Sequence, residues 1–230
     1  MIIGLIGAMD EELEILLKET EVEKTQIKAS MKFVKGHLYG KEVVVVRCGI
    51  GKVNSAICAQ ILVDDFNVDY VINVGIAGGI GANVKPGDVV IGDSLVQHDV
   101  EAIAFGYEAG QIPRIDTLDF KSSEYLVNLA KDACKDVLTH EYFVGRIATG
   151  DQFIADINKI KYIKETFDAI ACEMEGGSIA QSCYLNQVPF VVLRSISDNA
   201  DNGAHMDYEK FQHIAIKNST EIIKNMLIAM

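Results

Sequence analysis

The sequence predicts an α/β protein in which helices cover both faces of a central sheet. Apolar runs bounded by glycine or charge alternate with segments of helical periodicity along all 230 residues. Several runs are apolar on both faces, as in Val71–Val74 and Phe190–Leu193, and strands buried on both faces need helices on each side. Hydrophobic residues make up 49 % of the chain, enough for a large core, and no linker, repeat or low-complexity tract interrupts it. We therefore expect one domain over residues 1–230.

Taken in chain order, the apolar runs predict strands at Ile2–Gly7, Lys32–Leu38, Glu42–Arg47, Tyr70–Gly75, Val89–Val96, Phe143–Thr149, Ala169–Cys172 and Pro189–Ser195. Periodic apolar positions predict helices at Asp10–Glu19, Lys52–Asp65, Ser122–Val137, Asn158–Thr166, Glu175–Leu185 and Tyr208–Ile228. The first run, Met1–Met9, is short, lacks a basic flank and leads into acidic residues, which favours a core strand over a signal peptide. No apolar run reaches the length that spans a membrane.

Charge and cysteine content narrow the classes of partner. The formal net charge is −12, from 33 acidic against 21 basic residues. A surface of this sign repels nucleic-acid phosphates and anionic lipids, so we expect neither nucleic acid nor membrane as a partner, whereas a small neutral or zwitterionic ligand is compatible. Five cysteines without a C-x-x-C pair favour reduced, buried thiols and a cytoplasmic protein.

The ends of the predicted strands are the expected site, because ligands of α/β sheets gather beyond the carboxyl ends of the strands. Those ends read Ala8–Glu12, Gly49–Gly51, Gly75–Gly79, Gly150–Phe153, Glu173–Glu175 and Arg194–Asp198. Several are rich in carboxylates, two are interpreted as glycine turns, and one carries an arginine. The sequence thus predicts carboxylates clustered around a cavity backed by a dry sheet.

These carboxylates suit acid–base hydrolysis. Glu173 and Glu175 are two residues apart and would face the same way in extended backbone, although acids also favour the first turn of a helix. Asp198 follows a buried strand, where an unpaired charge costs several kcal/mol, and Arg194 is the obvious partner for part of the negative charge. One ionised carboxylate can activate water while a protonated one acts as an acid, and a negative pocket stabilises the cationic transition state at an anomeric carbon. Magnesium ranks lower, because no histidine or calcium-type loop joins these acids, and we expect no metal and no cofactor.

The stretch VVVVRCGIGKVN at 43–54 is nearly the dinucleotide fingerprint G-x-G-x-x-G, with Asn54 at the last glycine. A dehydrogenase would need an acid at the end of the next strand, but Tyr70–Gly75 ends in glycine, so this reading ranks last. We expect a tight strand-to-helix turn, with Lys52 as a surface residue at the helix start and not a phosphate ligand.

The residues alone do not decide the roles of Phe153 and of the apolar side chains in the segment Asp99–Asp119. Phe153 at a strand end is either a core residue or a stacking surface for a base. Phe105, Tyr107 and Pro113 lie in the weakly periodic segment Asp99–Asp119, which is typical of a lid, a subunit interface or local packing.

The strand ends also match a known family. Along its whole length the sequence resembles the nucleoside phosphorylase superfamily, and more narrowly the bacterial 5′-methylthioadenosine/S-adenosylhomocysteine nucleosidases. The matching motifs, in the right order and spacing, are IGAMDEE at 6–12, GIGKVN at 49–54, INVGIAGG at 72–79, AFGYEAGQIP at 104–113, TGDQFI at 149–154, CEMEG at 172–176 and RSISDNAD at 194–201. The resemblance implies a three-layer α/β/α fold with a mixed central sheet. It also implies hydrolysis of the N-glycosidic bond to adenine and a 5-thioribose, in methionine salvage and S-adenosylmethionine recycling.

The resemblance further implies residue roles. Glu12 would activate water, Asp198 would protonate adenine at N7, and Glu175 would bind the ribose hydroxyls. Arg194 would organise the water and carboxylates, Ser197 would orient Asp198, and Phe153 would stack on adenine. The other residues expected to line the substrate site are Met9, Ile50, Ile76, Ala77, Gly78, Ile154, Glu173, Met174 and Tyr208. Phe105 and Pro113 would complete the 5′-thio pocket of a neighbouring subunit, in a homodimer whose ligands are adenine nucleosides.

Two departures and two rivals accompany this interpretation. Ile76 stands where many relatives have serine, so we expect the water site to differ. Ala102 stands where a bulkier aliphatic residue is common, so we expect a looser 5′ pocket. Neither departure removes a residue expected to do chemistry. A phosphorylase is disfavoured because Asn73 and Ile76 replace its arginine and serine, and because a phosphate beside Glu12 would be repelled by several kcal/mol. A protein that binds nucleosides without catalysis is disfavoured because Glu12, Glu175 and Asp198 are all retained. Among substrates, 5′-deoxyadenosine and aminodeoxyfutalosine are further candidates that the sequence does not rank.

Overall fold

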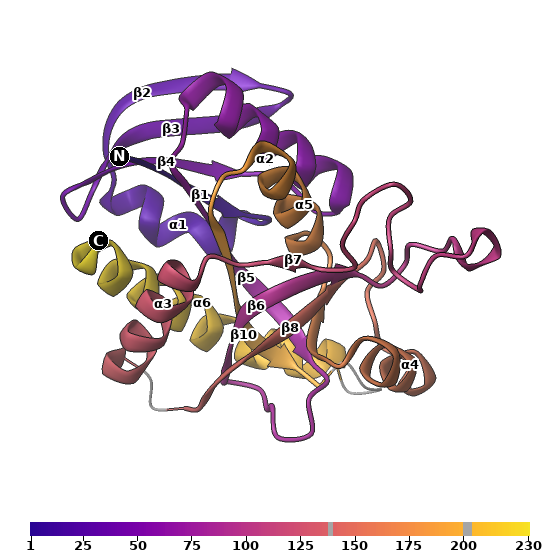
Figure 1. Ribbon diagram of the computed structural model, residues 1–230. Coiled ribbons are helices and arrows are strands. Elements are labelled where there is room, and N and C mark those ends of the chain that lie inside the picture. Colours follow the sequence, from indigo (N-terminus) through magenta and orange to yellow (C-terminus); the bar gives the residue numbers. More distant parts are fainter. Residues whose placement is uncertain (138–139, 200–203) are drawn as a thin grey trace.

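In the computed structural model, the described part of the chain forms ten strands and seven helical segments (Figure 1). The structure describes residues 1–137, 140–199 and 204–230, with the backbone alone over 204–215. The strands are β1 (Ile2–Gly7), β2 (Glu21–Lys28), β3 (Met31–Leu38), β4 (Lys41–Arg47), β5 (Tyr70–Gly79), β6 (Val89–Gln97), β7 (Phe120–Lys121), β8 (Tyr142–Thr149), β9 (Ala169–Glu173) and β10 (Phe190–Asp198). The helices are α1 (Asp10–Glu19), α2 (Lys52–Phe66), the 3-10 helix η1 (Ile103–Phe105), α3 (Glu124–Val137), α4 (Ile157–Phe167), α5 (Gly176–Asn186) and α6 (Ala204–Ala229).

The strands form one mixed sheet that partly closes on itself. Its order is β10-β6-β8-β9-β5-β1-β4-β3-β2, with β7 beside β6, and β10 pairs additionally with β5. β5 runs parallel to β1 and β10 but antiparallel to β9. The ring β5-β9-β8-β6-β10 therefore brings together strands that are distant in the sequence, and β5, β8, β9 and β10 of this ring end at the candidate site.

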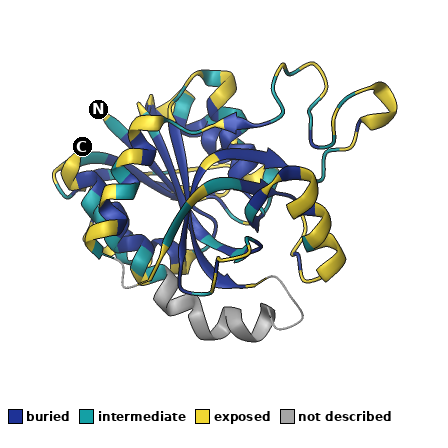
Figure 2. Ribbon diagram, turned by 60° about the horizontal axis from the view of Figure 1, so that its bottom comes forward, coloured by how far each residue is buried: buried dark blue, intermediate teal, exposed yellow. Residues whose placement is uncertain are grey.

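Helices cover both faces of the sheet, as expected for strands that are apolar on both sides. One face packs on α2 and α5 through residues such as Leu62 and Ile179, and the other packs on α1, α3 and α6 through residues such as Leu16, Leu126 and Ile223. Figure 2 shows the buried strands running through the centre with the exposed sides of the helices facing outward. The expected three-layer α/β/α fold with a mixed sheet is confirmed. Among the described residues no helix is both long and apolar enough to cross a membrane.

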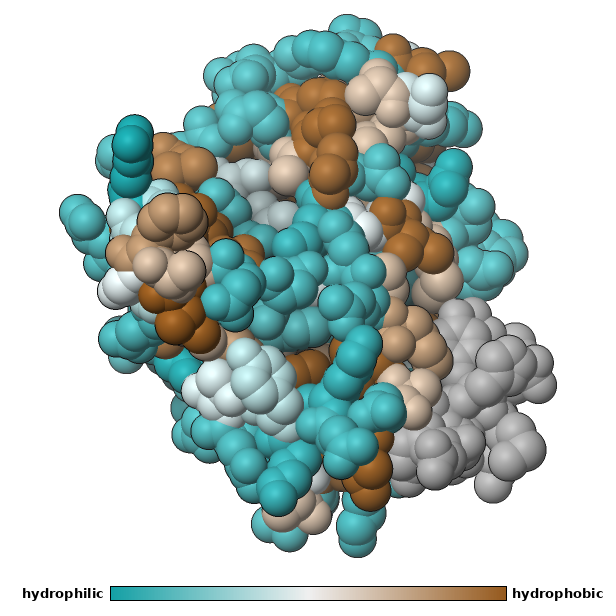
Figure 3. All heavy atoms as spheres, turned by 90° about the vertical axis from the view of Figure 1, so that its right-hand side faces the viewer, coloured by the Kyte–Doolittle hydropathy of each residue, from teal (hydrophilic) through white to brown (hydrophobic). Residues whose placement is uncertain are grey.

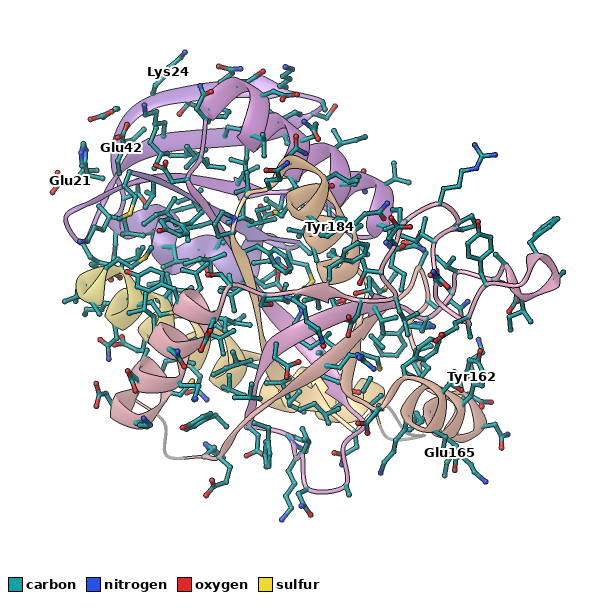
Figure 4. All side chains as sticks on the ribbon, in the orientation of Figure 1. Glu21, Lys24, Glu42, Tyr162, Glu165 and Tyr184 are labelled. Carbon is teal, nitrogen blue, oxygen red and sulfur yellow. The ribbon has the colours of Figure 1, made fainter. Side chains whose placement is uncertain are left out.

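All the predicted strands and helices are present, with ends shifted by a few residues, but the sequence analysis missed β2 and β7. β2 carries only Val22 and Ile27 as large apolar residues, and these are 55 % and 76 % exposed. It pairs with β3 alone, at the edge of the sheet, and Glu21 and Lys24 point outward from it in Figure 4. A strand that buries almost no side chain carries no apolar alternation from which it could be predicted.

One predicted turn is wrong. Gly75–Gly79 is not a glycine turn but the continuation of β5, and the strand predicted to stop at Gly75 runs to Gly79. Gly75 and Gly78 pair with Arg194 and Asp198 of β10, and Gly78 pairs with Cys172 of β9. Backbone groups that find partners on both sides keep a strand extended even where it is rich in glycine. β10 likewise continues through Ser197 and Asp198, which were placed after the strand.

Candidate active site

A cavity of about 350 Å³ opens where β1, β4, β5, β8, β9 and β10 end. Its lining comes from residues at or just after those strand ends: Ala8, Met9, Glu12, Ile50, Ile76, Ala77, Gly78, Gln152, Phe153, Ile154, Cys172, Glu173, Met174, Glu175, Ser197 and Asp198. This is the volume of a pocket for a small organic ligand. The strand ends predicted from sequence therefore meet at one place.

The cavity contains every predicted site residue except Arg194, Phe105, Pro113 and Tyr208. Arg194 is fully buried behind the wall, whereas Phe105 and Pro113 lie exposed on the segment after β6. The Tyr208 side chain lies outside the described residues. Ala8, Gln152 and Cys172 also line the cavity. Ala8 and Gln152 belong to strand ends expected to form the site but were given no role, and Cys172, which precedes Glu173, was missed.

Glu12 is held by backbone N–H groups from two strand ends. It is the third residue of α1 and turns back on its own helix start, where Oε2 accepts from the N–H groups of Ala8 at 2.7 Å and Met9 at 3.0 Å. Its Oε1 accepts from the N–H of Ile76 at 3.2 Å. Burial raises the pKa of Glu12, an effect only partly offset by the charge of Arg194 and by these three hydrogen bonds. A carboxylate with a raised pKa is suited to accept a proton near neutral pH.

Gly75 permits the close approach of Glu12 and Arg194. A Cβ atom at this position would lie 2.8 Å from Glu12 Oε1 and 3.0 Å from Arg194 Nη1. Any side chain there would force these two groups away from β5. The glycine misread as a turn residue thus makes room for the charged groups.

Arg194 is paired with Glu173 and does not reach the cavity. Its guanidinium forms an ion pair with Glu173 Oε2, and Nη2 donates to Asn73 Oδ1 at 2.6 Å. Glu173 also accepts from the hydroxyl of Thr149 and from the N–H groups of Glu175 at 3.0 Å and Gly176 at 2.7 Å.

This network keeps Glu173 ionised. Burial alone would raise the pKa of Glu173, but the charge of Arg194 and the hydrogen bonds outweigh it and lower the pKa. Thr149 was not singled out in the sequence analysis, and Asn73 was considered there only as the replacement of a phosphorylase arginine. Asn73 was visible as a polar residue inside an otherwise apolar strand.

Glu175 immediately precedes α5, and its side chain lines the cavity. Its Oε1 accepts from the N–H of Gly51 at 2.8 Å, which fixes the strand-to-helix turn before α2. Burial, followed by the nearby charge of Glu173, raises the pKa of Glu175 to about 7. Two glutamates two residues apart therefore differ in ionisation, because Arg194 forms its ion pair with Glu173 and not with Glu175.

The turn before α2 binds anions, but they are carboxylates of this protein. Gly49 and Gly51 have φ of +83° and +96°, the conformation that favours glycine. Besides the bond from Gly51 to Glu175, the N–H of Lys52 donates to Asp151 Oδ1 at 2.8 Å. A helix N-terminus attracts negative charge, and these side chains occupy the place of a phosphate.

Lys52 lies at the helix start, as expected, but its side chain is half-buried and paired and does not lie open on the surface. Its Nζ lies 2.6 Å from Asp99 Oδ1, with the Lys52 side chain only 19 % exposed. Asp99 also accepts from the N–H of Asp151 at 3.0 Å. The pair thus ties the start of α2 to the segment after β6 and to the loop that carries Phe153.

Asp198 and Phe153 also line the cavity. Asp198 is 3 % exposed, and Ser197 Oγ donates to its Oδ2 at 2.7 Å. Phe153 is 59 % exposed and lines the cavity, so its ring is not a core residue. Ile154, next in the chain, is buried beneath it. Across the described ranges, no group of three or more His, Cys, Asp or Glu residues is arranged to hold a metal ion.

The raised pKa of Glu175 predicts a pH-dependent stability difference. Folding raises this pKa from 4.5 to about 7, so the protonated form stabilises the fold fully below pH 4.5, and this contribution is lost as pH rises through 7. Glu175→Gln stays neutral and can still accept from Gly51. We expect the variant to be more stable than the wild type at pH 8, by on the order of 3 kcal/mol, with the difference vanishing below pH 4.5.

Urea denaturation of both proteins at pH 4.5 and 8 measures this effect. Glu165→Gln, on the exposed face of α4 (Figure 4), is the matched control: it removes only an exposed ion pair with Lys161 and should change stability by less than about 1 kcal/mol at either pH. Equal stability of wild type and Glu175→Gln at pH 8 would contradict the prediction.

Comparisons with known proteins place the chain among enzymes that act on nucleosides. The family model described as the phosphorylase superfamily matches residues 2–228. A 5′-methylthioadenosine/S-adenosylhomocysteine nucleosidase of an Exiguobacterium species is 43 % identical over 225 residues, covering 97 % of this chain and 96 % of the relative.

Solved structures agree with this comparison. The nucleosidase of the same description from Neisseria meningitidis, in complex with methylthio-immucillin-A, has a TM-score of 0.96 at 36 % identity, covering 100 % of this chain and 99 % of that one. A futalosine hydrolase of Helicobacter pylori has a TM-score of 0.93 at 35 % identity, covering 100 % and 98 %.

Proposed function

This chain belongs to the phosphorylase superfamily and, within it, to the 5′-methylthioadenosine/S-adenosylhomocysteine nucleosidases, and from this membership we propose its reaction. The protein hydrolyses the N-glycosidic bond of methylthioadenosine and S-adenosylhomocysteine, releasing adenine and the corresponding 5-thioribose. 5′-Deoxyadenosine is a further candidate substrate. The observation that carries the proposal is the meeting of Glu12, Glu175 and Asp198 in one cavity.

In the proposed mechanism, Glu12 takes a proton from water while the water oxygen bonds to C1′ of the sugar. The C1′–N9 bond breaks with its electron pair moving into the adenine ring, and Asp198 delivers a proton to N7. Adenine therefore leaves as a neutral molecule. The raised pKa of Glu12 matches its role as proton acceptor.

The remaining cavity residues orient the nucleoside in this proposal. Glu175 accepts hydrogen bonds from the ribose hydroxyls, with Met174 packed against the sugar. Phe153 stacks on adenine, the backbone of Ile154 contacts its polar edge, and Ser197 orients Asp198 through the 2.7 Å hydrogen bond. Arg194 acts from behind the wall by holding Glu173 and by its charge near Glu12.

Hydrolysis is favoured over phosphorolysis because the backbone N–H groups that could bind a phosphate already bind the Glu12 carboxylate. The N–H groups of Ala8, Met9 and Ile76, which point at one place, all donate to Glu12. Asn73, at the position of a phosphorylase arginine, is buried and binds Ile6 O and Arg194. A phosphate dianion would have to displace the carboxylate or lie beside it, at a cost of several kcal/mol.

The test is adenine release from methylthioadenosine by the purified protein in phosphate-free buffer. We expect adenine and 5-methylthioribose in equal amounts, with no increase when phosphate is added. Release only in the presence of phosphate, with a ribose-1-phosphate product, would identify a phosphorylase. Binding of methylthioadenosine without adenine release would identify a binding protein.

Aminodeoxyfutalosine hydrolysis is the second candidate, and the similarity to the futalosine hydrolase supports it. The catalytic groups required are the same, because only the 5′ substituent differs. The values of kcat/KM on methylthioadenosine, S-adenosylhomocysteine, 5′-deoxyadenosine and aminodeoxyfutalosine rank the substrates.

We also propose a cytoplasmic homodimer whose subunits share their sites. Phe105 is 84 % exposed and Ile103 is 54 % exposed, on a segment that projects from the body at the right of Figure 1. Figure 3 shows apolar clusters among polar residues on this side. In the dimer Phe105 and Pro113 complete the partner's 5′ pocket. The cytoplasmic location is supported by five free, buried cysteines.

Sedimentation equilibrium tests the dimer, with an expected mass twice the 25.2 kDa of the chain. A fully active particle of 25.2 kDa would contradict the shared site.

A further inference from the structure

A second hollow adjoins the cavity on the side of Met9 and Ile50. It is open to solvent, measures about 360 Å³, and is lined by Ala8, Met9, Asp10, Glu11, Arg47, Gly49, Ile50 and Asn54. Ala8, Met9 and Ile50 line both spaces. These residues therefore form the boundary that a ligand protruding from the cavity would cross.

The hollow carries charges of both signs that the proposed mechanism does not use. Arg47 is the last residue of β4, and Asp10 and Glu11 begin α1. Because Gly7 of β1 pairs with Arg47, the end of β4 lies beside the start of α1. Arg47 Nε lies 3.0 Å from Asp10 Oδ1, and the two side chains are 48 % and 80 % exposed. A guanidinium and carboxylates are thus available to a ligand in an open space.

The proposed binding mode directs a 5′ substituent toward this hollow. In the proposed function Asp198 and Phe153 hold adenine, and Glu175 and Met174 hold the sugar beside Glu12. The walls that this chain offers the 5′ group are Met9 and Ile50, opposite which the proposed dimer would place Phe105 of the partner subunit and Pro113 of the partner subunit, and Ile50 is 55 % exposed at the mouth. An apolar thioether fits against Met9 and Ile50, and whatever follows it enters the second hollow.

We propose that Arg47, Asp10 and Glu11 form a subsite for a zwitterionic amino-acid group at the end of a 5′-thio substituent. The inference rests on the proposed function and extends it to substrate choice. The α-carboxylate of S-adenosylhomocysteine binds the Arg47 guanidinium, and its α-ammonium binds Asp10 or Glu11. Methylthioadenosine has neither group and gains nothing there. The subsite is exposed, so its contribution is moderate and depends on salt.

The experiment compares kcat/KM for S-adenosylhomocysteine, methylthioadenosine and 5′-butylthioadenosine, which has an uncharged tail. In Arg47→Gln we expect about a five- to tenfold loss on S-adenosylhomocysteine, with the other two substrates changed less than about twofold. Asp10→Asn should also lower kcat/KM on S-adenosylhomocysteine selectively, but by less than Arg47→Gln. Lys18→Gln, which removes an exposed cation at the other end of α1, should change none of the ratios.

Salt gives a second readout. The wild-type preference for S-adenosylhomocysteine over 5′-butylthioadenosine should fall as ionic strength rises, and the preference of Arg47→Gln should not. Turnover of methylthioadenosine reports that each variant is folded.

An equal loss on all three substrates, or no loss on any, would overturn the subsite. The absence of adenine release from methylthioadenosine by the wild type would overturn the proposed function instead, so the two failures are distinguishable.

Discussion

Asp198→Asn is expected to lower kcat for adenine release from methylthioadenosine by at least about a hundredfold. Asparagine has nearly the same shape and can still accept from Ser197 Oγ, now 2.7 Å from Asp198 Oδ2, so the fold should persist. It has no acidic proton to deliver, and adenine would have to leave as an anion. Rapid-quench or steady-state assays of adenine formation measure the loss, and circular dichroism checks the fold.

A change of leaving group makes this prediction specific to the acid. A 5-methylthioriboside of 4-nitrophenol needs no protonation to leave. Asp198→Asn should therefore retain most of the wild-type rate on it, whereas Glu12→Gln should lose activity on both substrates because neither reacts without activated water. Loss of the nitrophenyl reaction in Asp198→Asn would show that Asp198 is needed for something other than proton donation.

Arg194→Met is expected to lower the free energy of unfolding by about 3–5 kcal/mol. The arginine is 2 % exposed and paired with Glu173, and its removal leaves a buried carboxylate without its cation. Asn73 Oδ1 would lose its donor as well. Urea denaturation at pH 7 measures the change.

The double variant Glu173→Gln/Arg194→Met tests the cause. Neutralising Glu173 removes the charge that Arg194 compensates, so the double variant should be less destabilised than the sum of the single ones. We expect the shortfall from additivity to be on the order of 1–3 kcal/mol. Additive losses would mean that Arg194 stabilises the fold by packing and not through the ion pair.

The sequence predicted the helices and the buried strands because burial leaves a periodic pattern of apolar residues. It did not predict β2, whose residues are exposed, or the extension of β5 through Gly75–Gly79, whose glycines resemble a turn. Pairing with β9 and β10 keeps this segment extended, and such pairing is a property of distant strands. The fingerprint at 49–54 was ambiguous for the same reason, because Glu175 and Asp151, which occupy its N–H groups, come from elsewhere in the chain.

By itself the sequence determined the layers of the fold, the strand ends that carry polar residues and, through its motifs, the family. The tertiary structure alone decided how these acids differ in ionisation. Arg194 contacts Glu173, which is kept ionised, while burial with less compensation raises the pKa of Glu12 and Glu175. The physical reason is that ionisation depends on burial and on distances between charges, and these distances were set when the ring of strands from β5 to β10 closed.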